Sequence, residues 1–334
     1  MHKERRAGNG NLSEGTINEQ VVAVRMLEEF LGGPTPACAI TKADMLNYKR
    51  ALMDTPTNYR LRFPGKTLPE AITANAKLEN PHKVLSPQTI NIKWLTHIGT
   101  IMGWCVANDL IEANPARGVK VATKKGKSEP TRVPFNQDDL QRIFGNELFS
   151  DPKSFETKQW SLLLALYTGA RSSSEIARIK LSDIFQEQSV NVIHLEDASK
   201  NVRSKRLVPV HRDLIDLGFL DHVEALRKQG KRRLFWDWEP EDKINRWFLR
   251  TFKPQVGISD SRKVFHSFRH SLKTELAKRG VNRDVSDLIT GHKDQAESGT
   301  YIHDASVTMI AAMNEGLNRA NFNLKLPRKI NLYV

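Results

Sequence analysis

The sequence predicts a mainly α-helical protein of two domains, with a small β-sheet that gives the second domain an α+β fold. The length of 334 residues exceeds what one hydrophobic core usually serves. Apolar residues recur at helical spacing through most of the chain. Only residues 189–199 and 205–211 alternate apolar and polar positions and are rich in valine and isoleucine, which predicts one β-hairpin.

Charge and cysteine content narrow the class of protein. The net charge of +13 and the pI near 9.7 favour a polyanionic partner, most commonly nucleic acid, although a merely solvated basic surface or an anionic membrane would also fit. The chain has no run of eighteen apolar residues and no apolar core of a secretory signal near its start. Cys38 and Cys105 are typical of a reducing cytosol and predict neither a disulfide nor a metal site.

The first domain is predicted over residues 13–118, after a tail at residues 1–12. Its first helix covers residues 13–31 and ends at a Gly-Gly-Pro sequence. A capping serine and a proline, Ser86 and Pro87, begin its longest remaining helix. The apolar stripe of that helix consists of Ile90, Trp94, Ile98, Ile101 and Cys105.

Between these two helices, Thr41 and Asp44 form a capping pair that begins a short helix through residue 52. Residues 54–85 are polar, contain four prolines and have no clear period. They are predicted to form a long, partly ordered loop.

Residues 119–133 are predicted to be a basic linker, because they lack apolar periodicity. A flexible basic segment would lie along a DNA backbone with its cations facing phosphates, although a simple soluble tether has the same composition. The candidate DNA-binding residues are Lys120, Lys124, Lys125, Lys127 and Arg132.

The second domain is predicted over residues 134–320, followed by a tail at residues 321–334. Asn136 and Asp139 form the cap of its first helix. A buried helix at residues 160–170 stops at Gly169. Further helices are predicted at residues 240–255, 266–280, 285–290 and 306–317.

Six residues of this domain have side chains suited to phosphate chemistry, although each alone would more often be structural. They are Arg171 after the buried helix, Lys200 at the hairpin tip, His266 and Arg269 one helical turn apart, His292, and Tyr301 in a polar, glycine-containing stretch. His266 and His270 have the spacing of zinc ligands, but no third ligand has suitable spacing and no glutamate stands in the metalloprotease position.

Taken in order, the six residues resemble the catalytic signature of the tyrosine recombinases, the phage integrase family. The sequences TGAR, RLVPV, HSFRH, and GH followed nine residues later by YIH are similar to that family. Residues 85–119 resemble the last long helical segment of an integrase core-binding domain. The resemblance covers about residues 13–317 and implies a helical core-binding, DNA-binding domain followed by a tyrosine-recombinase catalytic domain.

The resemblance implies an enzyme that cuts and rejoins DNA through a 3′-phosphotyrosyl bond. That bond stores the energy of the cut ester, so neither metal nor ATP is expected, and no cofactor is predicted. The implied roles are Tyr301 as nucleophile, Arg171 and Arg269 as ligands of the scissile phosphate, Lys200 as general acid, His266 as base, and His292 as a hydrogen-bond donor to the phosphate.

The resemblance also implies the partners and the setting. We expect double-stranded DNA, a homo-tetramer on DNA that is monomeric when free, a DNA-bending or directionality protein as accessory, and the bacterial cytoplasm. Integration or excision of a mobile element such as a prophage is the expected task. An N-terminal arm-binding domain is expected to be either absent or removed. A type IB topoisomerase-like relaxing enzyme, a non-catalytic DNA-binding protein and a generic basic binding module are the alternatives.

One position departs from the family pattern. The family usually has an acidic residue three positions after the first arginine, whereas Glu175 follows Arg171 by four. On one continuous helix the extra residue would rotate the pair by about 100°. The role of Glu175 therefore depends on whether a turn absorbs the extra residue.

Overall fold

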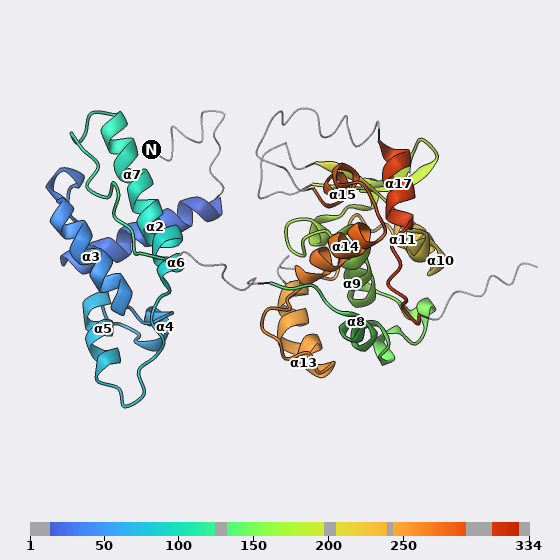
Figure 1. Cartoon of the computed structure of the whole chain (residues 1–334), viewed down its shortest axis with the longest axis horizontal. Helices are drawn as coiled ribbons and strands as arrows, with labels where there is room; N and C mark the ends of the chain where they lie inside the picture. Colours follow the sequence, from blue (N-terminus) through green and yellow to red (C-terminus); the bar gives the residue numbers. More distant parts are fainter. Residues whose placement is uncertain (1–13, 124–131, 197–204, 239–242, 292–308, 327–334) are drawn as a thin grey trace, which may run out of the picture. The chain divides into compact units, whose positions relative to one another are not determined.

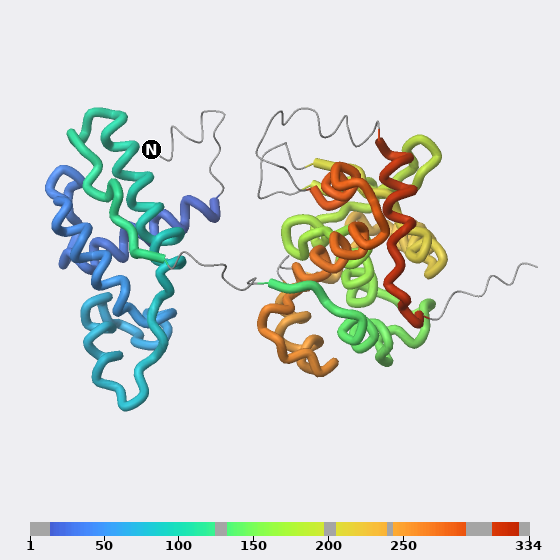
Figure 2. The backbone as a smooth tube through the Cα atoms, viewed as in Figure 1, coloured from blue at the N-terminus to red at the C-terminus, as the bar shows by residue number. Residues whose placement is uncertain are grey.

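The structure is a computed structural model, and it describes residues 14–123, 132–196, 205–238, 243–291 and 309–326. The chain divides into two compact units, Met1–Lys127 and Ser128–Val334 (Figures 1 and 2). Lys124, Lys125, Lys127, Lys200, His292 and Tyr301, which the sequence singles out, lie outside the described residues. Within the described part, no helix combines the length and the apolar character needed to cross a bilayer.

The elements of the described part of the first unit are helices, joined by turns and by one isolated β-bridge between Pro56 and Val84. Its elements are α2 (Glu14–Leu31), η1 (Ala37–Ala39), α3 (Lys42–Asp54), α4 (Tyr59–Arg62), α5 (Leu68–Ala76), α6 (Pro87–Thr89), the π-helical segment η2 (Ile90–Leu95) and α7 (Thr96–Ala107). The predicted Thr41–Asp44 cap begins α3, with reciprocal bonds of 2.9 and 3.2 Å. Of the predicted apolar stripe, Ile101 is half-buried and the other four residues are buried.

The predicted loop at residues 54–85 is wrong, because α4 and α5 lie within it. Its prolines suggested a break, yet Pro69 stands in the first turn of α5, where a missing N–H has no cost. Glu29 of α2 fixes both helices. Its carboxylate accepts hydrogen bonds from the Tyr59 hydroxyl at 2.7 Å and the Leu68 N–H at 3.1 Å. A local capping box of Thr67 and Glu70 begins α5, and the contacts of Glu29 connect both helices to α2.

The second unit is a mixed α and β structure with short connecting helices. Its elements before the sheet are α8 (Gln137–Phe144), η3 (Glu147–Phe149), η4 (Pro152–Ser154), α9 (Thr157–Thr168), η5 (Ile176–Arg178) and η6 (Leu181–Asp183). After the sheet come α10 (Arg212–Asp216), α11 (Phe219–Lys228), α12 (Lys243–Trp247), the π-helical η8 (Phe248–Phe252), α13 (Lys253–Gln255), α14 (Ser267–Lys278), α15 (Arg283–Thr290) and α17 (Ile310–Asn318). The predicted Asn136–Asp139 cap of α8 is confirmed.

The sheet has three antiparallel strands in the order β1 (Ile184–Glu187), β2 (Val190–Leu195) and β3 (Arg206–Pro209). The predicted hairpin corresponds to β2 and β3, whereas β1 was not predicted from its four residues. Val192 and Leu207 pack under Ile310 of α17 on one face, and the other face joins the main core. Both α15 and α17 pack against β3, which is buried at every position.

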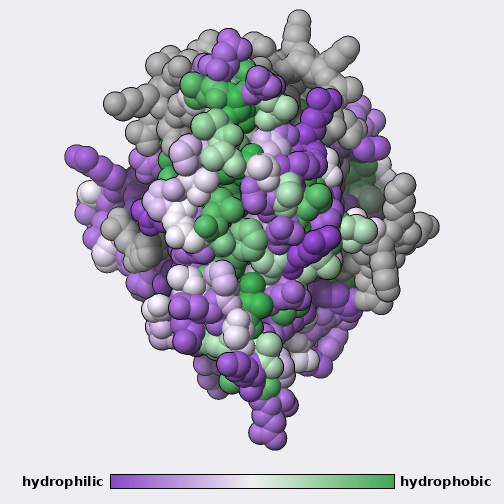
Figure 3. Space-filling view, turned by 90° about the vertical axis from the view of Figure 1, so that its left-hand side faces the viewer, coloured by the Kyte–Doolittle hydropathy of each residue, from purple (hydrophilic) through white to green (hydrophobic). Residues whose placement is uncertain are grey.

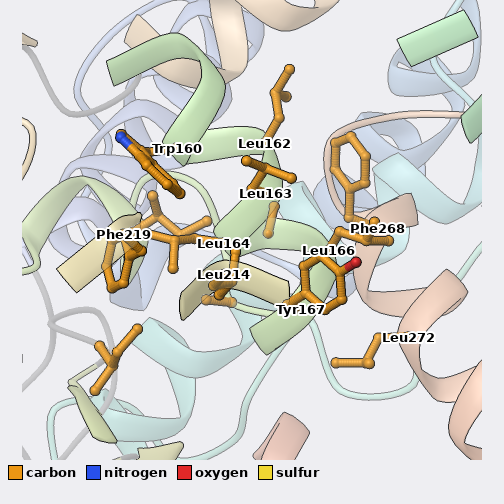
Figure 4. Packing of buried hydrophobic residues seen from close by; sticks show 14 of the residues in the cluster. Trp160, Leu162, Leu163, Leu164, Leu166, Tyr167, Leu214, Phe219, Phe268 and Leu272 are labelled. Carbon is orange, nitrogen blue, oxygen red and sulfur yellow. The ribbon is translucent and has the colours of Figure 1, made fainter. Parts of the chain in front are cut away.

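Helix α9 is the centre of the hydrophobic core (Figure 4). Trp160 packs against Phe219 with ring centroids 5.2 Å apart, and α14 approaches α9 with Phe268 and Leu272. The buried helix predicted at 160–170 is therefore confirmed, including its stop at Gly169. The core thus holds the end of α9 and the start of α14 rigidly together.

On the face of the molecule shown in Figure 3, hydrophobic residues form separate groups among hydrophilic ones.

Candidate active site

Arg171 is positioned by the end of helix α9. Gly169, the residue that ends this helix, has the left-handed backbone angle φ of 62°. The chain then turns sharply and places Arg171 with 30% of its side chain exposed. The Gly169 carbonyl also accepts a hydrogen bond of 2.9 Å from Nη1 of Arg269, so one turn orients both arginines.

Replacing Gly169 with alanine tests this turn. We expect a loss of roughly 1–2 kcal/mol in the free energy of unfolding from the left-handed backbone. A further loss is expected from crowding, since the new Cβ would lie 3.3 Å from Leu272 Cδ2 and 3.4 Å from Arg269 Cγ. The matched control is Gly230→Ala, with φ of 70°, where a Cβ would meet no heavy atom of the described chain within 4 Å. Urea unfolding of both variants measures the difference, and equal losses would contradict the crowding.

Glu175 lies beside Arg171 despite the extra residue between them. Its carboxylate accepts the Arg171 backbone N–H at 2.7 Å and Nη1 at 3.2 Å. This is achieved because residues 172–175 form a turn that leads into the 3₁₀ helix η5, rather than a continuous α-helix. The turn absorbs the extra residue.

A third arginine, Arg206 at the start of β3, completes the arrangement around Glu175. Its Nη1 and Nη2 donate to the two carboxylate oxygens at 2.6 and 3.3 Å. Burial opposes ionisation of Glu175, but the charge and hydrogen bonds of Arg206, and then Arg171, outweigh it and lower its pKa to about 2. The carboxylate is therefore charged at every pH at which the protein would work.

Arg269 lies in the first turn of α14, and His266, three residues earlier, is the N-cap residue of the same helix. Arg269 is 2% exposed. Burial, and then the charges of Arg206 and Arg171, lower its pKa to about 9, so the guanidinium stays charged at neutral pH. His266 is half-buried. Burial, followed by the charges of Arg269, His270 and Arg132, lowers its pKa to about 4. A neutral imidazole beside charged guanidiniums can accept a proton.

The low pKa of His266 predicts a pH-dependent stability. The unfolded chain takes up a proton near pH 6.5, whereas the folded protein takes it up only near pH 4. The stabilising contribution of His266 is therefore complete above pH 6.5 and is lost as the pH falls toward 4. We expect His266→Gln to flatten the decline in unfolding free energy between these values, as measured by urea titrations. A slope equal to that of the wild type would contradict a neutral folded-state His266.

Arg132 was predicted as a linker residue facing DNA, and the structure places its charge close enough to affect His266. The segment after it is anchored on α14. The Phe135 N–H donates to Ser271 Oγ at 2.9 Å, and the Phe135 ring lies 4.7 Å from that of Phe268. Arg132 is exposed, and so is Lys120, which lies near the end of the first unit.

The structure thus brings together Arg171, His266 and Arg269 of the predicted site. Arg206 was not among the residues predicted from the sequence, and the role of Glu175 had depended on the turn after Arg171. An arginine heading an otherwise apolar strand was the signal for Arg206, since a charge buried in a sheet needs a partner. Within the described ranges, no group of three or more His, Cys, Asp or Glu residues is placed to hold a metal ion.

Comparison with known proteins gives a consistent result. The model of the phage integrase family matches residues 134–307. Tyrosine recombinase XerC of Proteus mirabilis is 24% identical over 276 residues, which are 77% of this chain and 82% of that protein. Tyrosine recombinase XerD of the same organism is 26% identical over 187 residues, 53% of this chain and 57% of that protein.

Solved structures show the same fold. A lambda integrase dimer bound to a COC′ core site has a TM-score of 0.53 at 18% identity, covering 99% of this chain and 96% of that one. The Tn1549 transposon integrase, in complex with a circular intermediate DNA, has a TM-score of 0.56 at 15% identity, covering 96% and 93%.

Proposed function

Since the chain belongs to the phage integrase family and is an enzyme of DNA breaking and rejoining, we propose that it acts through a 3′-phosphotyrosyl intermediate. The observation that carries this proposal is the cluster of Arg171 and Arg206, which both bind the carboxylate of Glu175, with Arg269, which lies close enough for the charges of the other two arginines to lower its pKa. A phosphodiester would be attracted by the concentration of positive charge in this cluster. The partly exposed Arg171 gives this cluster access to solvent.

In the proposed complex, Arg171 and Arg269 bind the nonbridging oxygens of the scissile phosphate through their planar forks. His292 adds a hydrogen bond to the same phosphate. These donors stabilise the charge that grows on the oxygens as the phosphorus becomes pentacoordinate. Their orientation is set in advance, because Glu175 and the Gly169 carbonyl hold the two arginines.

The proposed chemical step exchanges one ester for another. His266 accepts the phenolic proton of Tyr301 as the oxygen attacks the phosphorus, and the lowered pKa of His266 keeps its imidazole neutral at neutral pH, as a proton acceptor must be. The bond from phosphorus to the 5′ oxygen breaks, and Lys200 donates a proton to that oxygen. Attack by the 5′-hydroxyl of a second strand on the phosphotyrosyl bond reverses the step and joins the new strand.

We further propose that the enzyme assembles as a homo-tetramer on two DNA duplexes and moves a mobile element such as a prophage. The basic linker residues would contact phosphates along the duplex. The chain is similar in fold to integrases solved on a core site and on a transposon intermediate, which supports DNA as the partner. An accessory DNA-bending protein would set the direction.

The test uses a supercoiled plasmid that carries two copies of the DNA flanking this gene in its genome. Protein is added in EDTA, the reaction is stopped with detergent, and covalent protein–DNA adduct and recombinant circles are measured. We expect both products. Adduct with relaxation alone would favour the topoisomerase-like alternative. DNA binding without adduct would contradict the proposal and favour a non-catalytic DNA-binding protein.

A further inference from the structure

Arg206 is a buried cation whose hydrogen bonds connect Glu175 of the candidate active site to the end of α15. It is 1% exposed and begins β3, on the core-facing side of the sheet with Val208. Burying a guanidinium is costly unless its donors are paired. Two of its nitrogens bind the carboxylate of Glu175, and the third, Nε, donates to the Ile289 carbonyl at 3.0 Å.

The Ile289 carbonyl belongs to the last turn of α15, where carbonyls have no partner within the helix. Gly291 ends this helix with φ of 64° and lies directly against the guanidinium. A Cβ at Gly291 would be 3.1 Å from Arg206 Nη1 and 3.2 Å from Cζ, so a larger residue would push against the guanidinium and would also strain this left-handed backbone. Arg206 therefore holds the backbone at the point from which the chain continues to His292.

Arg206 also positions Arg171, through the carboxylate of Glu175. Glu175, held by the fork of Arg206, accepts both the backbone N–H and Nη1 of Arg171. A single guanidinium thus joins the turn that carries Arg171 to the helix end that precedes His292. These two segments are more than a hundred residues apart in the sequence.

We propose that Arg206 is a positioning residue, which sets the separation between Arg171 and the end of α15 at Gly291 without contacting DNA itself. This inference rests on the proposed function of Arg171 and His292. Lysine at this position would keep the charge but could not bind both carboxylate oxygens and the Ile289 carbonyl together.

The test compares Arg206→Lys with Val208→Ala, a control in the same strand that removes buried core volume. DNA affinity, the single-turnover rate of adduct formation, the melting temperature and hydrogen exchange of the Arg171 and Gly291 amides are measured. For Arg206→Lys we expect DNA affinity within about twofold of wild type, a cleavage rate lower by roughly 100-fold, and faster exchange at both amides. Val208→Ala should lower the melting temperature but keep the cleavage rate.

Cleavage and amide exchange at the wild-type rates in Arg206→Lys would overturn the proposal. So would a Val208→Ala variant that has the same melting temperature as Arg206→Lys and loses as much of the cleavage rate. If Arg206→Lys does not fold, Gly291→Ala, which pushes the helix end off the guanidinium, must show the same separation of rate from affinity. A Gly291→Ala variant that cleaved DNA at the wild-type rate, or that lost DNA affinity together with cleavage rate, would also overturn the proposal. Absence of adduct from the wild type would instead contradict the proposed function, while the exchange data would still test the contact.

Discussion

Replacing Tyr301 with phenylalanine is expected to abolish covalent attachment to DNA while leaving DNA affinity within about twofold. Phenylalanine keeps the ring and removes only the attacking oxygen, so no phosphotyrosyl bond can form. We expect the rate of adduct formation to fall by at least about 10⁴-fold. A suicide substrate with a nick near the cleavage site traps the adduct, and a denaturing gel measures it.

The matched control is Tyr333→Phe, which removes a hydroxyl from a tyrosine outside every motif of the family signature. It should form adduct at the wild-type rate. Persistence of adduct in Tyr301→Phe would show that another residue is the nucleophile. Peptide mapping of the wild-type adduct would then identify that residue directly.

Arg269→Lys is expected to have the second largest effect. Lysine keeps one positive charge but loses the planar fork, and its shorter donor cannot bind both the Gly169 carbonyl and a phosphate. The cleavage rate should fall by about 10²–10³-fold. Because the side chain is 2% exposed, the free energy of unfolding should also fall, by roughly 1–3 kcal/mol.

The control is Arg279→Lys, at the other end of the same helix. Arg279 pairs with Glu275 at 2.7 Å, and 43% of its side chain is exposed. Its substitution should change stability by less than about 0.5 kcal/mol and leave cleavage unchanged. If both lysine variants cleaved at the wild-type rate, Arg269 would have no part in phosphate binding.

The local signals of the sequence were strongest where one physical preference decides the structure. Capping pairs at Thr41 and Asn136, and a glycine after the buried helix, act through backbone groups a few residues away. The alternation of β2 and β3 arises from the pleat of the chain. Such features require no knowledge of distant contacts, and they were predicted correctly.

The failures have different causes. Helix α5 within residues 54–85 begins with a local capping box of Thr67 and Glu70, a signal that the prolines obscured, and Glu29 of α2 accepts hydrogen bonds from both helices of this segment. Strand β1 has four residues, too few to show a period, and it exists because β2 provides its hydrogen-bond partners. The contacts of Glu29 are remote in sequence, whereas β1 pairs with the next strand across a two-residue turn.

The candidate site shows the same division. The sequence by itself determined the residue types and their order. An arginine pair, histidines, a lysine and a tyrosine are the side chains that phosphoryl transfer needs, once a fold brings them together around one phosphate. The pKa values of His266 and Arg269, the contact of Glu175 with Arg171, and the role of Arg206 were decided only by the tertiary structure. Burial and charge–charge distance set those properties, and both arise only when β3, the turn after α9 and the ends of α14 and α15 pack around one carboxylate.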